Sequence, residues 1–353
     1  MSEEVENKEA EEQEDELFVH RTIVIDPKQT PIRIDKFLMD RLERVSRHRI
    51  QNALKDGAIL VNDKEVKSNF KVKPGQEVTI LLNRPPREET FAVPEKMDLN
   101  IHFEDEDLII LNKPANLVVH PGVGNRSGTL VNGLAYYLKG KDIPVLDGND
   151  QNRAGLVHRL DKDTTGLMVI AKNSFTMTHL AKQFFNHTLR REYNALVWGG
   201  PEEPSGTIDV PIGRHPKYRK LQTTYLDDEG GKDAVTHYEV LEDMYYVSLV
   251  KCVLETGRTH QIRVHMKYLG HPVFNDAFYG GDSIRKGTIF TKYKQFVQNC
   301  FKLIPRQALH ARTIGFIHPR TEKEVYFESE LPDDMQTVLE KWRSYLSTRK
   351  TIQ

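Results

Sequence analysis

The sequence predicts an α+β fold in two domains: a small unit of two helices and a short sheet, then a larger unit with a mixed, mainly antiparallel sheet. The chain has 353 residues, whereas one domain usually holds about 100–200. Residues 85–97 begin with a run of proline and charge that indicates a stiff, polar linker. Beyond it, strand-like runs recur without the strand–helix alternation of parallel sheets, which favours antiparallel pairing.

The first domain, expected at residues 22–84, starts with a strand over 22–25 and continues into two helices. Apolar side chains at helical spacing predict the first helix, and they are Ile34, Phe37, Leu38 and Leu42. Ser46 is expected to cap the second helix, because its hydroxyl can accept a hydrogen bond from a free amide of the first turn. Gly57 is expected to end that helix, since glycine accepts positive φ.

A small sheet is expected to complete this domain. Strands over 58–61 and 65–66 flank a turn at 62–64, and another strand lies between 72 and 82, after the turn at Pro74-Gly75. The unit is therefore predicted to be a helix pair followed by a sheet.

The two helices leave seven basic side chains outside their apolar stripe. They are Arg33, Lys36, Arg41, Arg44, Arg47, Arg49 and Lys55. Such a cluster suits the phosphates of a nucleic acid, but a charged helix face is more often simply solvated. Charge alone therefore does not decide between these interpretations.

A local pattern supports the RNA-binding interpretation. It consists of Arg33-Ile34-Asp35-Lys36-Phe37-Leu38, Ser46-Arg47, Ile50-Gln51, Gly57, Val61-Asn62 and Val72-Lys73-Pro74-Gly75. This pattern resembles the alpha-L RNA-binding domain of the ribosomal protein S-four type over about residues 22–84. The resemblance implies that the basic residues contact RNA.

The N-terminal segment, residues 1–21, is strongly acidic. Residues 1–16 carry nine acidic residues and one lysine, so the net charge of −1 for the whole chain leaves +7 for the remainder. Self-repulsion and the lack of apolar periodicity predict a disordered tail. It either keeps the protein in solution or competes with RNA for basic surface, and the sequence leaves both roles open.

The chain is predicted to remain in the cytoplasm and not to bind a membrane. It is also predicted to be a monomer. No apolar run approaches the roughly 20 residues that span a bilayer, and the N-terminus lacks the order of a signal peptide. Cys252 and Cys300 are the two cysteines. They exclude a disulfide framework and a four-cysteine zinc site.

The second domain is expected at residues 98–353. The runs that predict its strands are 108–111, 167–171, 193–198, 246–254 and 325–328. Helical stretches are expected at 175–186 and 333–346.

The densest polar segment is Gly155–Gly166, directly before the apolar run 167–171. An isolated aspartate in a turn is usually only a cap or a turn former. His158, Arg159 and Asp161, however, lie within four residues, and burying such a group is costly unless its charges are paired. The segment 255–266 follows another strand and offers basic partners. These segments are therefore candidates for one site.

The two segments, with Leu111-Asn112-Lys113-Pro114 and Leu309-His310-Ala311, resemble the RluA-type family of pseudouridine synthases, most closely the large-subunit rRNA synthase D subgroup. The resemblance runs from about residue 22 to 330. It implies that Asp161 is the catalytic aspartate, that Arg263 pairs with it, and that Tyr193 stacks on the target uracil. Arg159 is implied to help fill the stack when the base leaves. His158 and Arg258 are further candidates for RNA contact.

Three departures from the family pattern affect loops. Thr165 stands where serine is common, Asn116 where glycine is common, and the segment 274–280 differs from the usual Gly-Asp-Pro version. Asn116 can keep the same turn, because asparagine tolerates the left-handed region. The departures leave Asp161, Tyr193 and Arg263 untouched.

The chemistry of uridine isomerisation suits these residue types. Breaking the N1–C1′ bond and forming C5–C1′ needs a carboxylate that acts as nucleophile or proton acceptor. Burial would raise the pKa of an aspartate, and a nearby arginine would favour its ionised form. Attack at C1′, attack at C6 and elimination through a glycal all remain open. The chemistry needs no redox or metal step, so no cofactor is expected.

Three other functions are compatible with parts of the sequence. His260, His265 and His271 lie close in sequence, but on a strand the first two would point to opposite faces, and no cysteine or paired acid completes a metal site. A glycosylase would need a second carboxylate, for which Asp163 is the candidate. A ribosome-assembly protein that binds RNA without catalysis would not need Asp161. The subgroup resemblance favours large-subunit, 23S-type rRNA as the partner.

Overall fold

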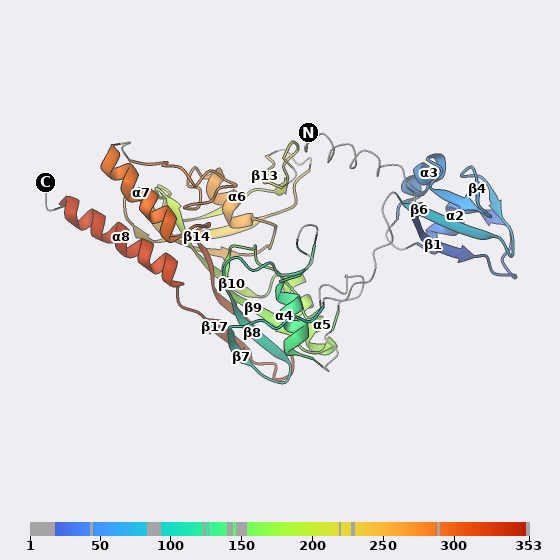
Figure 1. Cartoon of the computed structure of the whole chain (residues 1–353), viewed down its shortest axis with the longest axis horizontal. Coiled ribbons are helices and arrows are strands. Elements are labelled where there is room, and N and C mark those ends of the chain that lie inside the picture. The colour runs from blue at the N-terminus through green and yellow to red at the C-terminus, as the bar shows by residue number, and fades with distance from the viewer. Residues whose placement is uncertain are drawn as a thin grey trace, which may run out of the picture. The chain divides into compact units, whose positions relative to one another are not determined.

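The computed structural model describes residues 18–42, 45–82, 93–122, 125, 127–139, 144–145, 154–218, 220–226, 230–287 and 290–350 (Figure 1). The chain divides into two compact units, Met1–Thr90 and Phe91–Gln353. Most of the acidic tail, residues 83–92 of the linker region and Arg44 lie outside the described residues. No described helix is both long and apolar enough to cross a membrane.

The first unit contains a four-stranded sheet in the order β1-β6-β3-β4, a separate β2–β5 ribbon and two helices. Its elements are β1 (Phe18–Val24), β2 (Ile32–Arg33), α2 (Ile34–Met39), α3 (Arg47–Lys55), β3 (Ile59–Val61), β4 (Lys64–Glu65), β5 (Lys71–Val72) and β6 (Glu77–Leu82). An apolar cluster that includes Ile34, Phe37, Leu38 and Ile50 joins the helices to the sheet. The unit therefore has a core of its own.

The predicted helix boundaries in this unit hold with one exception. Ser46 Oγ accepts the Arg49 amide at 3.3 Å, and Gly57 follows the second helix with φ +69°. The first helix, however, ends at Met39, before Leu42. The strand expected between 72 and 82 is interrupted, because β5 pairs with β2 whereas β6 pairs with β1 and β3.

The second unit is built on a nine-stranded sheet. Eight strands run in the order β11-β14-β15-β10-β16-β9-β8-β7, and β17 pairs with β16. The strands are β7 (Ile101–Glu104), β8 (Leu108–Lys113), β9 (Thr165–Ala171), β10 (Arg190–Trp198), β11 (Ser205–Asp209), β14 (Val235–Asp243), β15 (Val247–Leu254), β16 (Leu309–Ile317) and β17 (Glu324–Glu328). Only β16 and β9 pair in parallel among these described strands. The predicted α+β class and mainly antiparallel pairing are confirmed.

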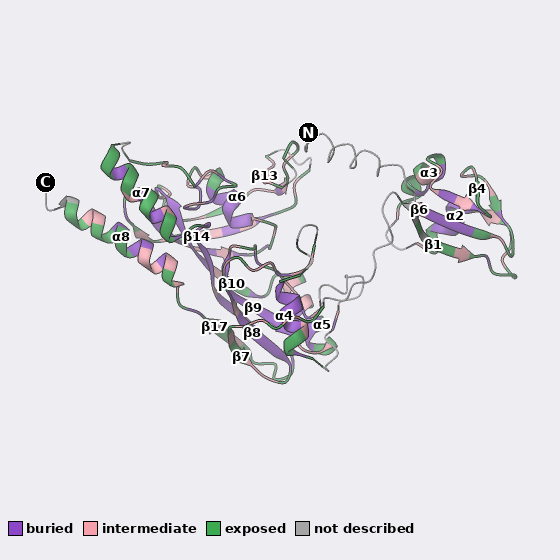
Figure 2. Cartoon of the chain, in the orientation of Figure 1, coloured by how far each residue is buried: buried purple, intermediate pink, exposed green. Residues whose placement is uncertain are grey.

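Helices cover both faces of this sheet. They are α4 (Leu130–Tyr137), α5 (Ser174–Phe185), α6 (Gln261–Tyr268), α7 (Thr291–Leu303) and α8 (Asp333–Lys350), and a small ribbon pairs β12 (Ile212–Arg214) with β13 (Gln222–Thr224). Ile109 and Leu111 of β8 pack in one apolar cluster with α4, while Leu108 and Ile110 pack in another with Leu180 of α5. This alternation follows the period of a strand. Figure 2 shows the central strands buried between these layers.

One expectation about local structure was wrong. Residues 261–268 form the helix α6, so His260 and His265 do not lie on a strand. His260 is the N-cap of this helix with φ +59°, a left-handed conformation that few non-glycine residues adopt. The helix is short and carries Arg263 on a buried turn.

Candidate active site

Asp161 lies in the loop that leads into β9, and its side chain is 20% exposed. The residue that meets it is Arg263 of α6, whose Nη1 donates to Asp161 Oδ2 at 2.9 Å. The two residues are 102 positions apart, so the fold creates this ion pair. Because the Arg263 side chain is only 4% exposed, the pair places a charged carboxylate at the edge of the core with a fixed direction.

A second carboxylate, Asp276, fixes the arginine. Arg263 Nε donates to Asp276 Oδ2 at 2.6 Å and Nη2 donates to Oδ1 at 2.9 Å. The Asp276 side chain is fully buried, and it also accepts the amides of Phe278 and Tyr279. Burial alone would lower the pKa of Arg263, but the hydrogen bonds and charges of Asp276 and Asp161 raise it above its usual value. Arg263 therefore stays charged between two aspartates.

His260 forms another side of the site. Its Nε2 lies 3.8 Å from Asp161 Oδ2, and its Nδ1 lies 2.7 Å from the Tyr279 hydroxyl. Burial lowers the pKa of His260, although the charge of Asp161 opposes this shift. A neutral ring that accepts the Tyr279 hydroxyl at Nδ1 carries its proton on Nε2, on the side of Asp161.

The loop around Asp161 is held by side chains from distant segments. Lys113 Nζ donates to the carbonyls of Pro114, Leu117 and Lys162 at 2.8, 3.0 and 2.8 Å. Arg306 Nη1 donates to the Asp163 carbonyl at 3.2 Å. These bonds fix the main-chain carbonyls of Lys162 and Asp163, the two residues that follow Asp161.

The junction of this loop with β9 is equally constrained. Gln307 Nε2 donates to Thr164 Oγ1 at 3.3 Å, and Thr165 Oγ1 lies 2.8 Å from His310 Nδ1. Gly166 pairs with Ala311 across the parallel register, and a Cβ at Gly166 would lie 2.2 Å from the Ala311 carbonyl oxygen. Glycine is therefore required where β9 starts beside β16.

Tyr193 lies on β10 and is 8% exposed within the main apolar cluster. Burial raises the pKa of Tyr193, Arg191 opposes the shift, and the charge of Asp161 adds to it. The phenol is therefore protonated at neutral pH. The stacking role of Tyr193 stays a prediction.

The remaining candidates near the site differ in their surroundings. Arg159 is exposed, with Nη1 3.5 Å from His120 Nε2. Arg258 is partly exposed and donates from Nε to the Asp233 carbonyl at 2.8 Å. Contact of these arginines with RNA stays a prediction.

His158 is engaged by the fold itself. Its Nε2 accepts the Val169 amide at 3.0 Å, and its ring stacks on Phe184 with 4.8 Å between centroids. Burial, with a contribution from the charge of Arg191, lowers the pKa of His158 to about 3. The ring is therefore neutral and is held by Val169 and Phe184. Its contact with RNA stays a prediction.

We expect His158→Gln to make the free energy of unfolding less dependent on pH at acidic pH. In the unfolded chain the pKa of a histidine is about 6.5, whereas the pKa of His158 in the folded protein is about 3. Between these two pH values the unfolded state therefore binds more protons than the native state. The stability from neutral His158 is complete above that window and is lost as pH falls through it, at about 1.4 kcal/mol per pH unit. Glutamine keeps an acceptor for the Val169 amide. Urea unfolding at several pH values measures the slope, the exposed His102→Gln variant is the control, and parallel profiles for wild type and His158→Gln would contradict the expectation.

The basic residues of the first unit divide into two groups. Arg33 and Arg47 both pair with Asp35, at 2.9 and 3.0 Å. Burial alone would raise the pKa of Asp35, but the hydrogen bonds from Arg33, Arg47 and Gln51 hold it well below its usual range. The other predicted residues that the structure describes are exposed, and they are Lys36, Arg41, Arg49 and Lys55. Arg44 lies outside the described residues.

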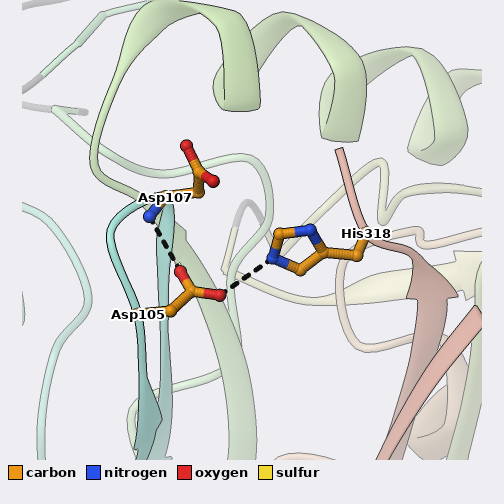
Figure 3. Close-up of side chains that lie close together, drawn as sticks. All are labelled: Asp105, Asp107 and His318. Atoms are coloured by element: carbon orange, nitrogen blue, oxygen red, sulfur yellow. Dashed lines mark hydrogen bonds and ion pairs between the residues drawn. The ribbon is translucent and has the colours of Figure 1, made fainter. Parts of the chain in front are cut away.

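A separate cluster has the residue types of a metal site. Ligand atoms of Asp105, Asp107 and His318 lie within 4.8 Å of one another (Figure 3). However, Asp105 Oδ2 is already bonded to His318 Nε2 at 2.9 Å, and Asp107 is held by the guanidinium of Arg320 and by Asn173. A cation is therefore supplied by the chain itself, and the cluster joins the β7–β8 turn to the end of β16.

Comparison with known proteins identifies related chains. Residues 107–268 match the family model described as RNA pseudouridylate synthase, and residues 32–78 match that of the S4 domain. A protein of Chlorobaculum parvum described as an uncharacterized RNA pseudouridine synthase is 44% identical over 331 residues, which cover 94% of this chain and 100% of that protein. The ribosomal large subunit pseudouridine synthase D of Escherichia coli strain K12 is 39% identical over 334 residues, covering 94% and 97%. The solved structure of human RNA pseudouridylate synthase domain containing 4 aligns with a TM-score of 0.52 and 26% identity, covering 69% of this chain and 93% of its own.

Proposed function

This chain belongs to the RNA pseudouridylate synthase family, and from that premise we propose that it isomerises specific uridines of large-subunit ribosomal RNA with Asp161 as the reacting carboxylate. One observation carries the assignment of Asp161. Its carboxylate is partly exposed and bonded to a buried arginine that a second, fully buried aspartate, Asp276, holds in place. Because Asp276 fixes the guanidinium of Arg263, the Asp161 carboxylate is held in one orientation in which a substrate can reach it.

The reaction moves the uracil on its ribose without loss of atoms. The N1–C1′ bond breaks, the C5–C1′ bond forms, the proton on C5 leaves and N1 gains a proton. Asp161 supplies the anion that attacks C1′ or C6, or that removes the proton at C2′ to give a glycal. In each route Arg263 stabilises the ionised carboxylate before the reaction and orients it.

The target uridine must leave its stack before Asp161 can reach it. Flipping costs a few kcal/mol and less for a loop nucleotide. In this proposal the ring of Tyr193 stacks on the flipped uracil, and Arg159, which is exposed, fills the space that the base leaves. Stacking of a base on an aromatic side chain contributes about 1–3 kcal/mol, enough to offset much of the flipping cost.

Ribosomal RNA is the proposed substrate for two reasons. The Escherichia coli relative is named for the ribosomal large subunit and matches nearly its full length. The S4 domain matched at residues 32–78 adds exposed basic side chains that suit an RNA backbone. We therefore also propose that the reaction takes place in the cytoplasm.

Carbodiimide mapping of large-subunit rRNA, incubated with and without the purified protein, tests the function. We expect new carbodiimide-dependent stops at a few uridines and an unchanged RNA mass. Release of free uracil would instead indicate an N-glycosylase. Tight RNA binding without either product would indicate an assembly protein.

Removal of residues 1–84 is expected to weaken RNA binding far more than the chemical step. The first unit carries the basic helices, and contacts to phosphates release counterions, so the salt dependence of binding should become shallower. Asp161 and Arg263 lie in the second unit, which has its own core. Single-turnover rates at saturating RNA should therefore stay within about tenfold of the full chain, or about 1.4 kcal/mol in barrier.

The acidic tail requires a control, because the same truncation removes it. A protein lacking only residues 1–16 shows what the tail contributes. If neither truncation changes the affinity for RNA or its salt dependence, the first unit does not hold the RNA, and the proposal that its basic helices bind the substrate is wrong.

A further inference from the structure

Arg191 is a buried cation that no described carboxylate neutralises. It lies on β10, two residues before Tyr193, and is 7% exposed. Its Nη2 makes one long hydrogen bond, 3.3 Å to the Glu255 carbonyl, and its Nε is completely buried without a partner. Burying an unpaired charge is expensive, so this guanidinium requires an explanation that packing does not supply.

The two acidic side chains closest to Arg191 along the chain and across the strand pair, Glu192 and Glu255, interact with other residues. Glu192 pairs with Arg190 at 3.0 Å, and the Glu255 carboxylate lies 2.6 Å from His237 Nε2. Glu255 thus offers Arg191 only its carbonyl. Burial lowers the pKa of Arg191, whereas the two aspartates raise the pKa of the equally buried Arg263. The two neighbouring carboxylates, Glu192 and Glu255, are thus paired with other residues, and Arg191 has no ion pair with a described carboxylate.

One side of the Arg191 guanidinium packs against the backbone of Gly257. Gly257 is exposed, and a Cβ at this position would lie 2.9 Å from Arg191 Nη1. The Phe184 ring occupies another side, 5.4 Å from the Arg191 Cζ atom. Nη1 makes no hydrogen bond to a described residue and, unlike Nε, is not completely buried, so an anion can approach it.

We propose that Arg191 binds a backbone phosphate of the RNA beside the target uridine, an inference that rests on the proposed function. Arg191 and Tyr193 lie on the same face of β10, because side chains alternate along a strand. A phosphate near Arg191 therefore belongs to the nucleotide that Tyr193 receives or to its neighbour. The planar guanidinium suits phosphate oxygens. The phosphate of the bound RNA would then supply the negative charge that pairs with Arg191.

The first test compares Arg191→Met with the wild type. Binding of a synthetic hairpin of large-subunit rRNA, chosen to contain a uridine that the carbodiimide mapping finds modified, is measured over a range of salt concentrations. We expect roughly tenfold weaker binding, as for a lost hydrogen bond to a charged group, and a logarithmic salt slope smaller by about 0.7. The melting temperature should be unchanged or higher, because methionine removes an unpaired buried charge. Arg190→Met is the matched control, since Arg190 is exposed, paired with Glu192 and on the opposite face of the strand.

A chemical substitution in the RNA then identifies the contact. Methylphosphonate, which is neutral, replaces one loop linkage at a time. At one linkage the wild type should lose about tenfold in affinity while Arg191→Met loses nothing further. Gly257→Ala, whose Cβ would lie 2.9 Å from Nη1 and would displace the guanidinium, should weaken binding at the same linkage.

Two results would overturn the inference. One is an equal methylphosphonate loss in wild type and Arg191→Met at every linkage. The other is a lower melting temperature with unchanged RNA affinity in Arg191→Met, which would make Arg191 a packing residue. Both readouts are independent of turnover. Wild-type protein that forms no pseudouridine would refute the proposed function and leave the binding result intact.

Discussion

Purified Asp161→Asn protein should form no detectable pseudouridine while it binds RNA within a few-fold of the wild type. Asparagine keeps the shape of the side chain and an oxygen that can accept the hydrogen bond of Arg263 Nη1. It removes the anion that each route through C1′, C6 or a glycal requires. Carbodiimide mapping measures product and equilibrium binding measures affinity. Arg263 remains paired with Asp276, so the fold should be stable.

A neighbouring residue provides the control for this prediction. Asp163 lies two positions further along the same loop and is the second carboxylate that a glycosylase would need. Asp163→Asn should keep pseudouridine formation, because the scaffold contact from Arg306 uses the main-chain carbonyl of this residue. Product from Asp161→Asn, after mass spectrometry has excluded deamidation to aspartate, would refute the assignment of Asp161.

The parts of the fold that the sequence predicted are those with strong local signals. The apolar run before Ala171 became a strand that is buried at every position, and the Ser46 cap formed as expected. The two family resemblances are confirmed by the matched models. Helix α6 was missed because its residues follow a strand and include four polar or charged side chains, and packing against the sheet decides its conformation.

The candidate site was predicted only in part, for a physical reason. A sequence can mark Asp161 and Arg263 by type and pattern, but the residues that hold them are brought together by tertiary structure. Asp276 lies in the segment 274–280, which stood out only as a departure from the family pattern, yet its carboxylate makes two of the bonds to Arg263. The burial of Asp276 and its two hydrogen bonds from Arg263 show its role, and neither can be read from one sequence.

We expect Arg263→Met to lower the free energy of unfolding by about 3–5 kcal/mol, the usual effect of removing one partner of a buried ion pair. The cause is Asp276, whose side chain is fully buried and would lose the cation with which it is paired. The variant should also lose activity, because Asp161 loses its charged donor. Loss of a hydrogen bond to a charged group, about 1.5–3 kcal/mol, corresponds to roughly a ten- to hundredfold lower rate.

The double variant Arg263→Met/Asp276→Asn separates stability from catalysis. Asparagine at 276 removes the uncompensated charge and keeps an acceptor for the amides of Phe278 and Tyr279, so much of the lost stability should return while the rate stays low. Urea unfolding and single-turnover kinetics on the same preparations give both quantities. Arg320→Met is the matched control, because it removes an arginine from a buried aspartate, Asp107, in the separate cluster of Figure 3 and should leave the rate unchanged. A double variant as active as the wild type would show that the ion pair between Arg263 and Asp161 is not needed for the reaction. Arg263 is the arginine bonded to the Asp161 carboxylate, and the double variant lacks it.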